Sequence, residues 1–169
     1  MMATARGHTA RLRKIKLLLL DVDGVLTDGG VYYSNTGDEL KKFNIQDGYG
    51  IVKLQRFGVK VGIITGRVSK AVERRAAELG ITEVRQNLEK KLEAYEDILR
   101  TSGVTDAEVA YIGDDEPDLP VLQRVGFSAA PRDAVLQVRK AVRFICTRTG
   151  GHGAVREVID LLLAHRRNG

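Results

Sequence analysis

The feature that most constrains the fold is a regular alternation of short apolar runs with amphipathic helical stretches. The apolar runs have the length of strands, and glycines such as Gly58 and Gly80 follow the helical stretches. This alternation predicts a doubly wound α/β fold, in which a parallel sheet carries helices on both faces and right-handed crossovers join the strands. We expect strands at residues 15–20, 59–65, 83–85, 108–112, 127–130 and 144–146, and helices at residues 49–57, 68–79, 88–100, 118–125, 134–140 and 154–164.

One segment interrupts this alternation directly after the first strand. Residues 31–33 and 39–43 have strand-like composition, and the turn residues of 34–38 separate them, so we expect a β-hairpin. The chain has 169 residues and is 43% hydrophobic, which suits one well-buried domain and is too short for two. We assign residues 14–165 to this domain and residues 1–13 to a basic tail, solvated and partly disordered.

The positive charge of the chain is concentrated at its start. The formal net charge is +5, and residues 1–20 hold five basic residues and no acidic one, so the remainder is balanced. A nucleic-acid surface would need a basic stripe with interleaved aromatic residues, and the sequence has none. No apolar run approaches the roughly 18 residues that would span a membrane. The single cysteine, Cys146, lies in an apolar stretch and fits a reducing compartment. We therefore expect a cytoplasmic protein without nucleic-acid or membrane partners.

Two carboxylates follow the first strand. Asp21 and Asp23 begin on the same side of the chain because strand side chains alternate, and Gly24 allows a sharp turn. Like charges this close repel unless a cation lies between them, they share a proton, or they divide the roles of nucleophile and acid. Taken alone, however, this motif is more often a simple turn.

Further polar residues follow later strands, and the carboxyl ends of parallel strands form the ligand-binding edge of such a sheet. Thr65 and Gly66 could hold an anion such as phosphate, although Thr65 taken alone is more often a helix cap. Lys91 lies on a highly charged helix, where a lysine is by itself a surface residue.

A third strand end is crowded with acids. Asp114, Asp115 and Asp118 follow residues 108–112, and adjacent acids are costly without a cation. Hard oxygen ligands in few fixed positions suit Mg²⁺. Asp118 is also placed to cap the following helix.

Taken together and in this order, the motifs resemble the haloacid dehalogenase superfamily of phosphotransferases over residues 14–163. The resemblance implies that Asp21 attacks phosphorus to form an aspartyl phosphate, and that Asp23 acts first as acid and then as base. It also implies Mg²⁺ bound by the Asp21 and Asp114 carboxylates and the Asp23 backbone carbonyl. Thr65 and Lys91 would bind the phosphate oxygens. Asp115 would orient Lys91 or a metal-bound water, and Asp118 would either support the site or remain a plain cap.

The spacing leaves no room for a cap domain, since 37 residues separate Thr27 from Thr65 and 25 separate Thr65 from Lys91. An open site needs a lid, from either a macromolecular substrate or a neighbouring subunit. Residues 43–51 and 150–157 are similar to the capless, tetrameric 3-deoxy-D-manno-octulosonate 8-phosphate phosphatases. This resemblance implies a homotetramer assembled through the hairpins, with a neighbour helping to close the site. It also makes residues 150–153 a glycine-rich tail that folds over a site, unless they are merely a turn.

The same resemblance implies a sugar-acid phosphate substrate in a pathway that feeds lipopolysaccharide. Arg67 and Arg75 would lie on one helical face and pair with the sugar-acid carboxylate. The full set of implied substrate contacts is Asp23, Asn44, Asp47, Gly48, Gly66, Arg67, Arg75 and Lys91.

Three positions depart from the family pattern, because Gln46, Val52 and His152 stand where arginine is common. These departures keep open a nine-carbon ulosonate 9-phosphate as the substrate. A non-catalytic oligomerisation module of the same fold is a further alternative, although it would not require all of the predicted catalytic residues. A receiver-type signalling domain would need neither Asp23 nor the hairpin.

Overall fold

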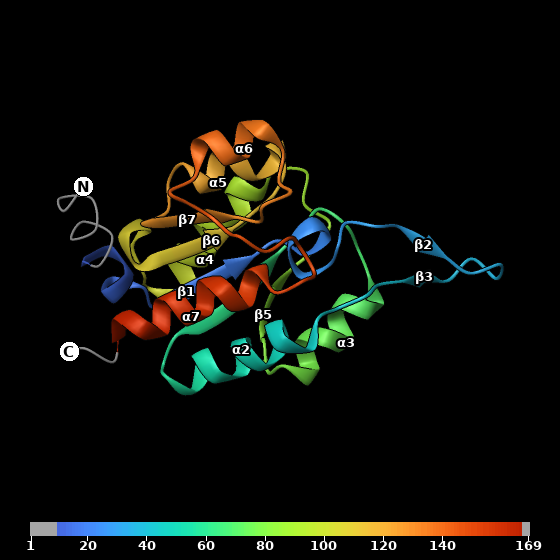
Figure 1. Ribbon diagram of the computed structural model, residues 1–169, viewed down its shortest axis with the longest axis horizontal. Coiled ribbons are helices and arrows are strands. Elements are labelled where there is room, and N and C mark those ends of the chain that lie inside the picture. Colours follow the sequence, from blue (N-terminus) through green and yellow to red (C-terminus); the bar gives the residue numbers. More distant parts are fainter. Residues whose placement is uncertain (1–9, 167–169) are drawn as a thin grey trace.

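The computed structural model describes residues 10–166, which form a sheet covered by helices on both faces (Figure 1). Six strands lie in the order β5-β4-β1-β6-β7-β8, and each neighbouring pair is parallel. The predicted Rossmann-like, doubly wound sheet of the haloacid dehalogenase type is therefore confirmed. Its strands are β1 (Leu17–Leu20), β4 (Lys60–Ile64), β5 (Glu83–Arg85), β6 (Val109–Ile112), β7 (Phe127–Ala130) and β8 (Phe144–Ile145).

The central strand β1 explains how the sheet is covered on both sides. Leu18 and Leu20 point into the core shared with α2, α3 and α7, whereas Leu17 and Leu19 point into the core shared with α4, α5 and α6. An all-leucine strand therefore has no solvent face, as expected at the centre of a parallel sheet. The helices are α2 (Ile45–Arg56), α3 (Lys70–Glu78), α4 (Lys91–Ser102), α5 (Leu119–Leu122), α6 (Leu136–Ala141) and α7 (Ala154–Arg166).

Helix ends differ from the predictions where local capping decides them. Helix α2 begins four residues earlier than predicted because the Asn44 side chain accepts hydrogen bonds from the Gln46 and Asp47 amides. Helix α3 begins two residues later than predicted, after Ser69. Residues 116–118 form a separate short turn that precedes α5, so the helix predicted at 118–125 is much shorter.

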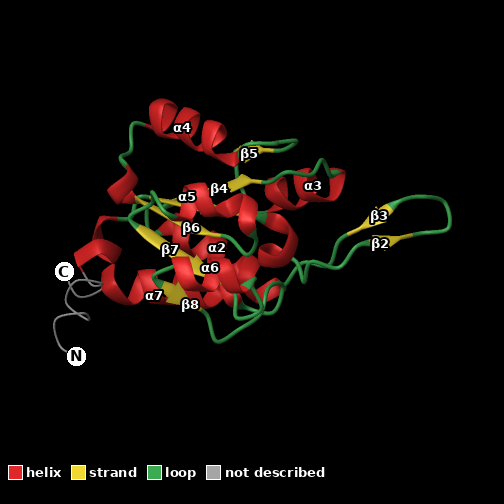
Figure 2. Cartoon of the chain, turned by 90° about the horizontal axis from the view of Figure 1, so that it is seen from above, coloured by secondary structure: helices red, strands yellow, loops and turns green. Residues whose placement is uncertain are grey.

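The predicted hairpin is present and projects from the body of the molecule (Figure 2). Strands β2 (Tyr32–Tyr33) and β3 (Glu39–Leu40) pair antiparallel over two residues each. Tyr33 and Leu40 are 66% and 59% exposed, so the hairpin carries apolar surface into solvent. Within residues 10–166 no cap domain is inserted. Over the same residues, no helix combines the length and apolar character needed to cross a membrane.

The prediction for the N-terminal tail is wrong from residue 10 onward. Residues 10–14 are helical, and Leu12 is only 1% exposed in the core that contains α7. The Arg166 side chain on α7 donates to the Ile15 carbonyl, which ties the two ends of the described chain together. The apolar spacing of Leu12 and Ile15 among basic residues is the signal for this helical turn. The rest of the predicted tail, residues 1–9, lies outside the described residues.

Candidate active site

The carboxyl ends of three neighbouring strands bring the predicted catalytic residues to one edge of the sheet. β4 and β6 flank β1, so Thr65 and Asp114 lie on either side of Asp21. The Asp21 amide donates to the Ile112 carbonyl at 3.0 Å, which fixes against β6 the start of the turn formed by residues 21–27, the predicted catalytic turn. Thr65 is 2% exposed and precedes the start of α3 by five residues, so it does not cap that helix.

The turn that follows β1 is braced from within. Gly24 has a φ of +87°, a left-handed conformation that favours glycine. The Thr27 hydroxyl accepts hydrogen bonds from the amides of Gly24 and Gly29 and donates to the Val22 carbonyl. A Cβ on Gly24 would lie 2.5 Å from Asp114 Cγ, so only glycine allows the Asp114 carboxylate to approach the turn. The motif thus fixes the peptide between Asp23 and Gly24 beside Asp114.

Lys91 is part of the site and not a surface lysine. It is the first residue of α4 and is 7% exposed, and its Nζ lies 2.9 Å from Asp21 Oδ1 and 2.7 Å from Asp118 Oδ1. Burial alone would lower the pKa of Lys91, but the two carboxylates outweigh burial and raise it. Lys91 therefore stays cationic and is held at the Asp21 carboxylate.

Asp118, and not Asp115, orients Lys91. Asp118 is fully buried, and its Oδ1 also accepts from the Tyr111 hydroxyl at 2.5 Å. Its Oδ2 accepts from the amides of Asp114 and Asp115 at 2.9 and 3.3 Å. The Asp115 side chain accepts from the Glu116 amide and is exposed. Asp118 is therefore more than a helix cap, because it connects Lys91 to the acidic strand end.

The acidic cluster fits a hard divalent cation. One carboxylate oxygen each from Asp21, Asp114 and Asp118 can be chosen within 4.8 Å of the others, but Asp118 is already saturated by its four donors. Asp114 Oδ1 is buried and has no hydrogen-bond partner among residues 10–166. Burial, reinforced by neighbouring carboxylates, raises the pKa of Asp21 to about 6 and that of Asp114 to about 8. A cation bound between these two oxygen donors would remove that penalty.

A second group of predicted residues gathers at the start of α2. Arg75 Nη2 donates to the Asn44 carbonyl at 3.4 Å, and the Arg75 guanidinium lies where a Cβ on Gly48 would stand. Asp47 is 1% exposed and accepts from the amides of Gly153 and Arg156 at the start of α7. In the described chain Asp47 therefore caps α7 instead of pointing into an open site, whereas Asn44, Gly48 and Arg75 form one cluster.

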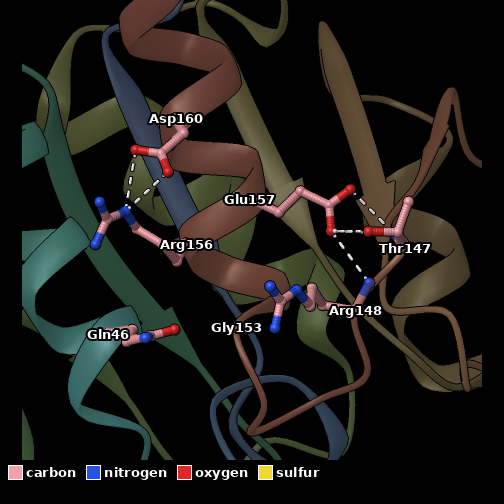
Figure 3. Close-up of a pocket in the computed structure, with 7 residues that line it drawn as sticks. All are labelled: Gln46, Thr147, Arg148, Gly153, Arg156, Glu157 and Asp160. Atoms are coloured by element: carbon pink, nitrogen blue, oxygen red, sulfur yellow. Dashed lines mark hydrogen bonds and ion pairs between the residues drawn. The ribbon is translucent and has the colours of Figure 1, made fainter.

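The glycine-rich segment 150–153 forms a turn directly before α7, the second of the two alternatives, and packs into the body of the molecule. The Gly150 amide donates to Asp133, and the Gly151 amide donates to the Val25 carbonyl. The Glu157 carboxylate holds the preceding residues by accepting from Thr147 and from the Arg148 amide (Figure 3). A Cβ on Gly150 would stand 2.9 Å from the Thr27 carbonyl oxygen. The segment therefore packs on the backbone of the catalytic turn and supports it.

Comparisons with known proteins agree with this geometry. Residues 50–126 match the model of the haloacid dehalogenase-like hydrolases. The 3-deoxy-D-manno-octulosonate 8-phosphate phosphatase of Escherichia coli K12 is 48% identical over 154 residues, which are 91% of this chain and 82% of that protein. The chain belongs to this phosphatase family. Its members are haloacid dehalogenase-like hydrolases that act on phosphate monoesters.

Solved structures of the same family have the same fold. The Yersinia pestis phosphatase has a TM-score of 0.93 at 45% identity, covering 95% of this chain and 87% of that one. The Moraxella catarrhalis phosphatase has a TM-score of 0.92 at 42% identity, covering 95% and 92%. That structure is a complex with magnesium ion, phosphate ion and a KDO molecule.

The three positions at which the resemblance led us to expect arginine lie in different surroundings. Gln46 is exposed on α2 and lines a hollow with Gly153 and Arg156 (Figure 3). Val52 is half-buried and packs on the core. His152 is exposed, and its Nε2 lies 3.3 Å from Lys42 Nζ.

Two contacts at the site were not predicted from the sequence. Lys41 pairs with Asp23 Oδ1, and Glu39 pairs with Arg67 at 2.7 Å. Arg67 therefore lies in the loop before α3 and bonds to the hairpin, so the prediction that it shares a helical face with Arg75 is wrong. Only the proximity of the hairpin to the first motif in sequence hinted at these contacts.

Proposed function

We propose that this chain is a Mg²⁺-dependent phosphatase that hydrolyses 3-deoxy-D-manno-octulosonate 8-phosphate to the free sugar acid and phosphate. The observation that carries the proposal is the Asp21 carboxylate at the end of β1, paired with buried Lys91 and close to the Asp114 carboxylate, whose Oδ1 has no hydrogen-bond partner among residues 10–166. A nucleophile, a phosphate-binding cation and a metal position meet there. The Moraxella catarrhalis complex supports the choice of metal and sugar acid.

In the first step, Asp21 attacks phosphorus while the bond from phosphorus to the C8 oxygen breaks. Asp23 gives its proton to the departing oxygen, which leaves as an alcohol. In the second step a water attacks phosphorus, Asp23 takes up a proton from it, and the bond between Asp21 and phosphorus breaks. Together, the two steps return Asp21 and Asp23 to their starting states.

The other residues of the site stabilise charge. Lys91 and Thr65 would contact the equatorial phosphate oxygens, and Asp118 holds Lys91 in place for this contact. The Asp21 and Asp114 carboxylates and the Asp23 backbone carbonyl would hold Mg²⁺, which neutralises the repulsion between the nucleophile and the phosphate when bound. Buried carboxylates with raised pKa values are the feature that such a cation would satisfy.

We further propose that the enzyme is a cytoplasmic homotetramer and that a neighbouring subunit helps to close each site. Exposed Tyr33 and Leu40 on the projecting hairpin support assembly through this element. The cluster of Asn44, Gly48 and Arg75 has no hydrogen bond or ion pair to Asp21 within the described chain, so these substrate contacts would serve through assembly.

The test is Mg²⁺-dependent phosphate release from a panel of eight-carbon and nine-carbon ulosonate phosphates and neutral sugar phosphates. We expect the highest kcat/KM on the eight-carbon 8-phosphate. A preference for the nine-carbon 9-phosphate, which Gln46, Val52 and His152 keep open, would retain the chemistry and change the substrate. A tetramer that binds Mg²⁺ and releases phosphate from none of the panel would contradict the proposal and favour a non-catalytic module.

A further inference from the structure

The hairpin supplies a buried lysine to the catalytic turn. Lys41 follows β3, and its side chain is 3% exposed, whereas that of the next residue, Lys42, is 59% exposed. Lys41 Nζ bonds to Asp23 Oδ1 and lies 3.5 Å from Glu39 Oε1. A lysine at the base of a projecting hairpin is normally solvated, so its burial against two carboxylates is a specific arrangement.

This lysine connects two parts of the site. Glu39 also accepts from Arg67 Nη2 at 2.7 Å, so four alternating charges run from Asp23 through Lys41 and Glu39 to Arg67. Asp23 belongs to the catalytic turn, and Arg67 belongs to the loop after β4. The hairpin therefore links the predicted acid–base residue to a predicted substrate contact.

Lys41 is also the group that holds the Asp23 carboxylate in place. Across residues 10–166, the only side chain that hydrogen-bonds to Asp23 is that of Lys41. The Asp23 side chain is partly exposed, with 28% of its surface open to solvent. Without the bond to Lys41, it would sample several rotamers. A buried cation needs its partners, so Lys41 stays with the two carboxylates and limits the positions of Asp23.

On the basis of the proposed phosphatase activity, we propose that Lys41 is a positioning residue that aims the Asp23 carboxyl group at the leaving oxygen. It does not contact phosphate. Its contribution belongs to the step in which the leaving group receives a proton, and it depends on how much the leaving group needs that proton. The base of the hairpin is thereby part of the acid–base machinery.

Leaving-group dependence separates this role from phosphate binding. A sugar alkoxide is a poor leaving group and needs a proton from Asp23, whereas p-nitrophenolate departs without one. The ratio kcat/KM reports events up to phosphorylation of Asp21, so the later hydrolysis of the aspartyl phosphate does not enter the comparison. General acid catalysis is worth roughly 10²- to 10⁴-fold, and a misdirected acid loses part of that factor.

The experiment compares wild type, Lys41→Met, Lys41→Arg and the control Lys42→Met. Each variant is assayed with the ulosonate phosphate that the wild type hydrolyses fastest and with p-nitrophenyl phosphate. For Lys41→Met we expect kcat/KM to fall by about 10- to 100-fold on the sugar phosphate and by less than about threefold on the aryl phosphate. Lys41→Arg should restore most of the difference, and Lys42→Met should leave the ratio of the two activities unchanged.

Inorganic phosphate provides the second readout. Its inhibition constant should be the same in wild type and Lys41→Met, because Lys41 is not a phosphate ligand in this account. Equal losses on both substrates, or a raised inhibition constant for phosphate, would overturn the role of Lys41. Failure of the proposed substrate would instead show in the wild type, as weak activity on the eight-carbon 8-phosphate beside normal activity on the aryl phosphate.

Discussion

Replacing Gly150 by alanine should damage catalysis more than it damages folding. Gly150 packs directly on the backbone of the catalytic turn, where an added Cβ would stand 2.5 Å from the Gly24 carbonyl carbon and 2.9 Å from the Thr27 carbonyl oxygen. These neighbours are backbone atoms, so no side chain can rotate away. Gly150 lies outside the left-handed region in which alanine is strained, and the contact alone is perturbed.

The size of the effect follows from the required movement. Carbon atoms pack at about 3.5 Å or more, so the turn and the glycine-rich segment must separate by about 1 Å. A misplacement of about 1 Å costs on the order of 10²-fold in rate. Forcing one extra carbon into a packed region costs about 1–3 kcal/mol. We therefore expect kcat to fall about 100-fold and the free energy of unfolding to fall by about 1–3 kcal/mol.

Gly58→Ala is the matched control. Gly58 follows α2 with a φ of +80°, and a Cβ there would have no neighbour within 4 Å. This substitution should cost about 1–2 kcal/mol through backbone strain and leave kcat unchanged. The measurements are urea unfolding and Mg²⁺-dependent phosphate release from the preferred ulosonate phosphate. Wild-type kcat in Gly150→Ala would refute the idea that this segment holds the catalytic turn.

Three further outcomes are expected. Asp21→Asn should abolish phosphate release while the circular dichroism spectrum and assembly state stay unchanged. Phosphate release by this variant at the wild-type rate would exclude Asp21 as the nucleophile. Lys91→Met should lower the free energy of unfolding in urea by about 3–5 kcal/mol and abolish activity, because it leaves Asp21 and Asp118 buried without their cation. The control is Lys90→Met, which changes an exposed lysine and should have neither effect. Without metal, the pKa values of Asp21 and Asp114 are raised to about 6 and about 8, so the folded state binds protons that the unfolded state releases. The contribution of these two groups to the free energy of unfolding is therefore complete below about pH 4 and is lost as pH rises to about 8. Saturating Mg²⁺ should raise Tm most at the upper end of this interval, and a Tm shift that shrinks with rising pH would contradict the metal assignment.

The sheet and the meeting of the predicted catalytic residues at one edge could be predicted because both depend on local signals. Apolar runs marked the strands, and the parallel topology required that Asp21, Thr65 and Asp114 meet at one edge. Lys91 could be assigned only through the family resemblance, because a lysine on a charged helix carries no local sign of burial. Its partner Asp118 could not be told apart from a helix cap.

Contacts between segments that are distant in the chain could not be predicted from the sequence. Asp47 and Gly153 are far apart in the chain, and nothing near either residue shows that one carboxylate caps the other segment. For the same reason the sequence left two alternatives for residues 150–153, a tail over the site and a simple turn, and did not show that Gly150 packs closely on the catalytic turn. In the sequence, Lys41 is only one residue of the predicted hairpin, and only the fold brings it to Asp23.

The central claim is that Asp21 receives the phosphoryl group, and the most direct measurement traps that state. Beryllium fluoride with Mg²⁺ mimics a phosphorylated carboxylate, and a crystal structure of the treated enzyme locates the fluoride. We expect beryllium bonded to an Asp21 carboxylate oxygen, with Lys91 and Thr65 contacting the fluorine atoms and Asp23 nearby. Beryllium fluoride bound to another carboxylate, or a Mg²⁺-loaded site that leaves Asp21 unmodified, would contradict it.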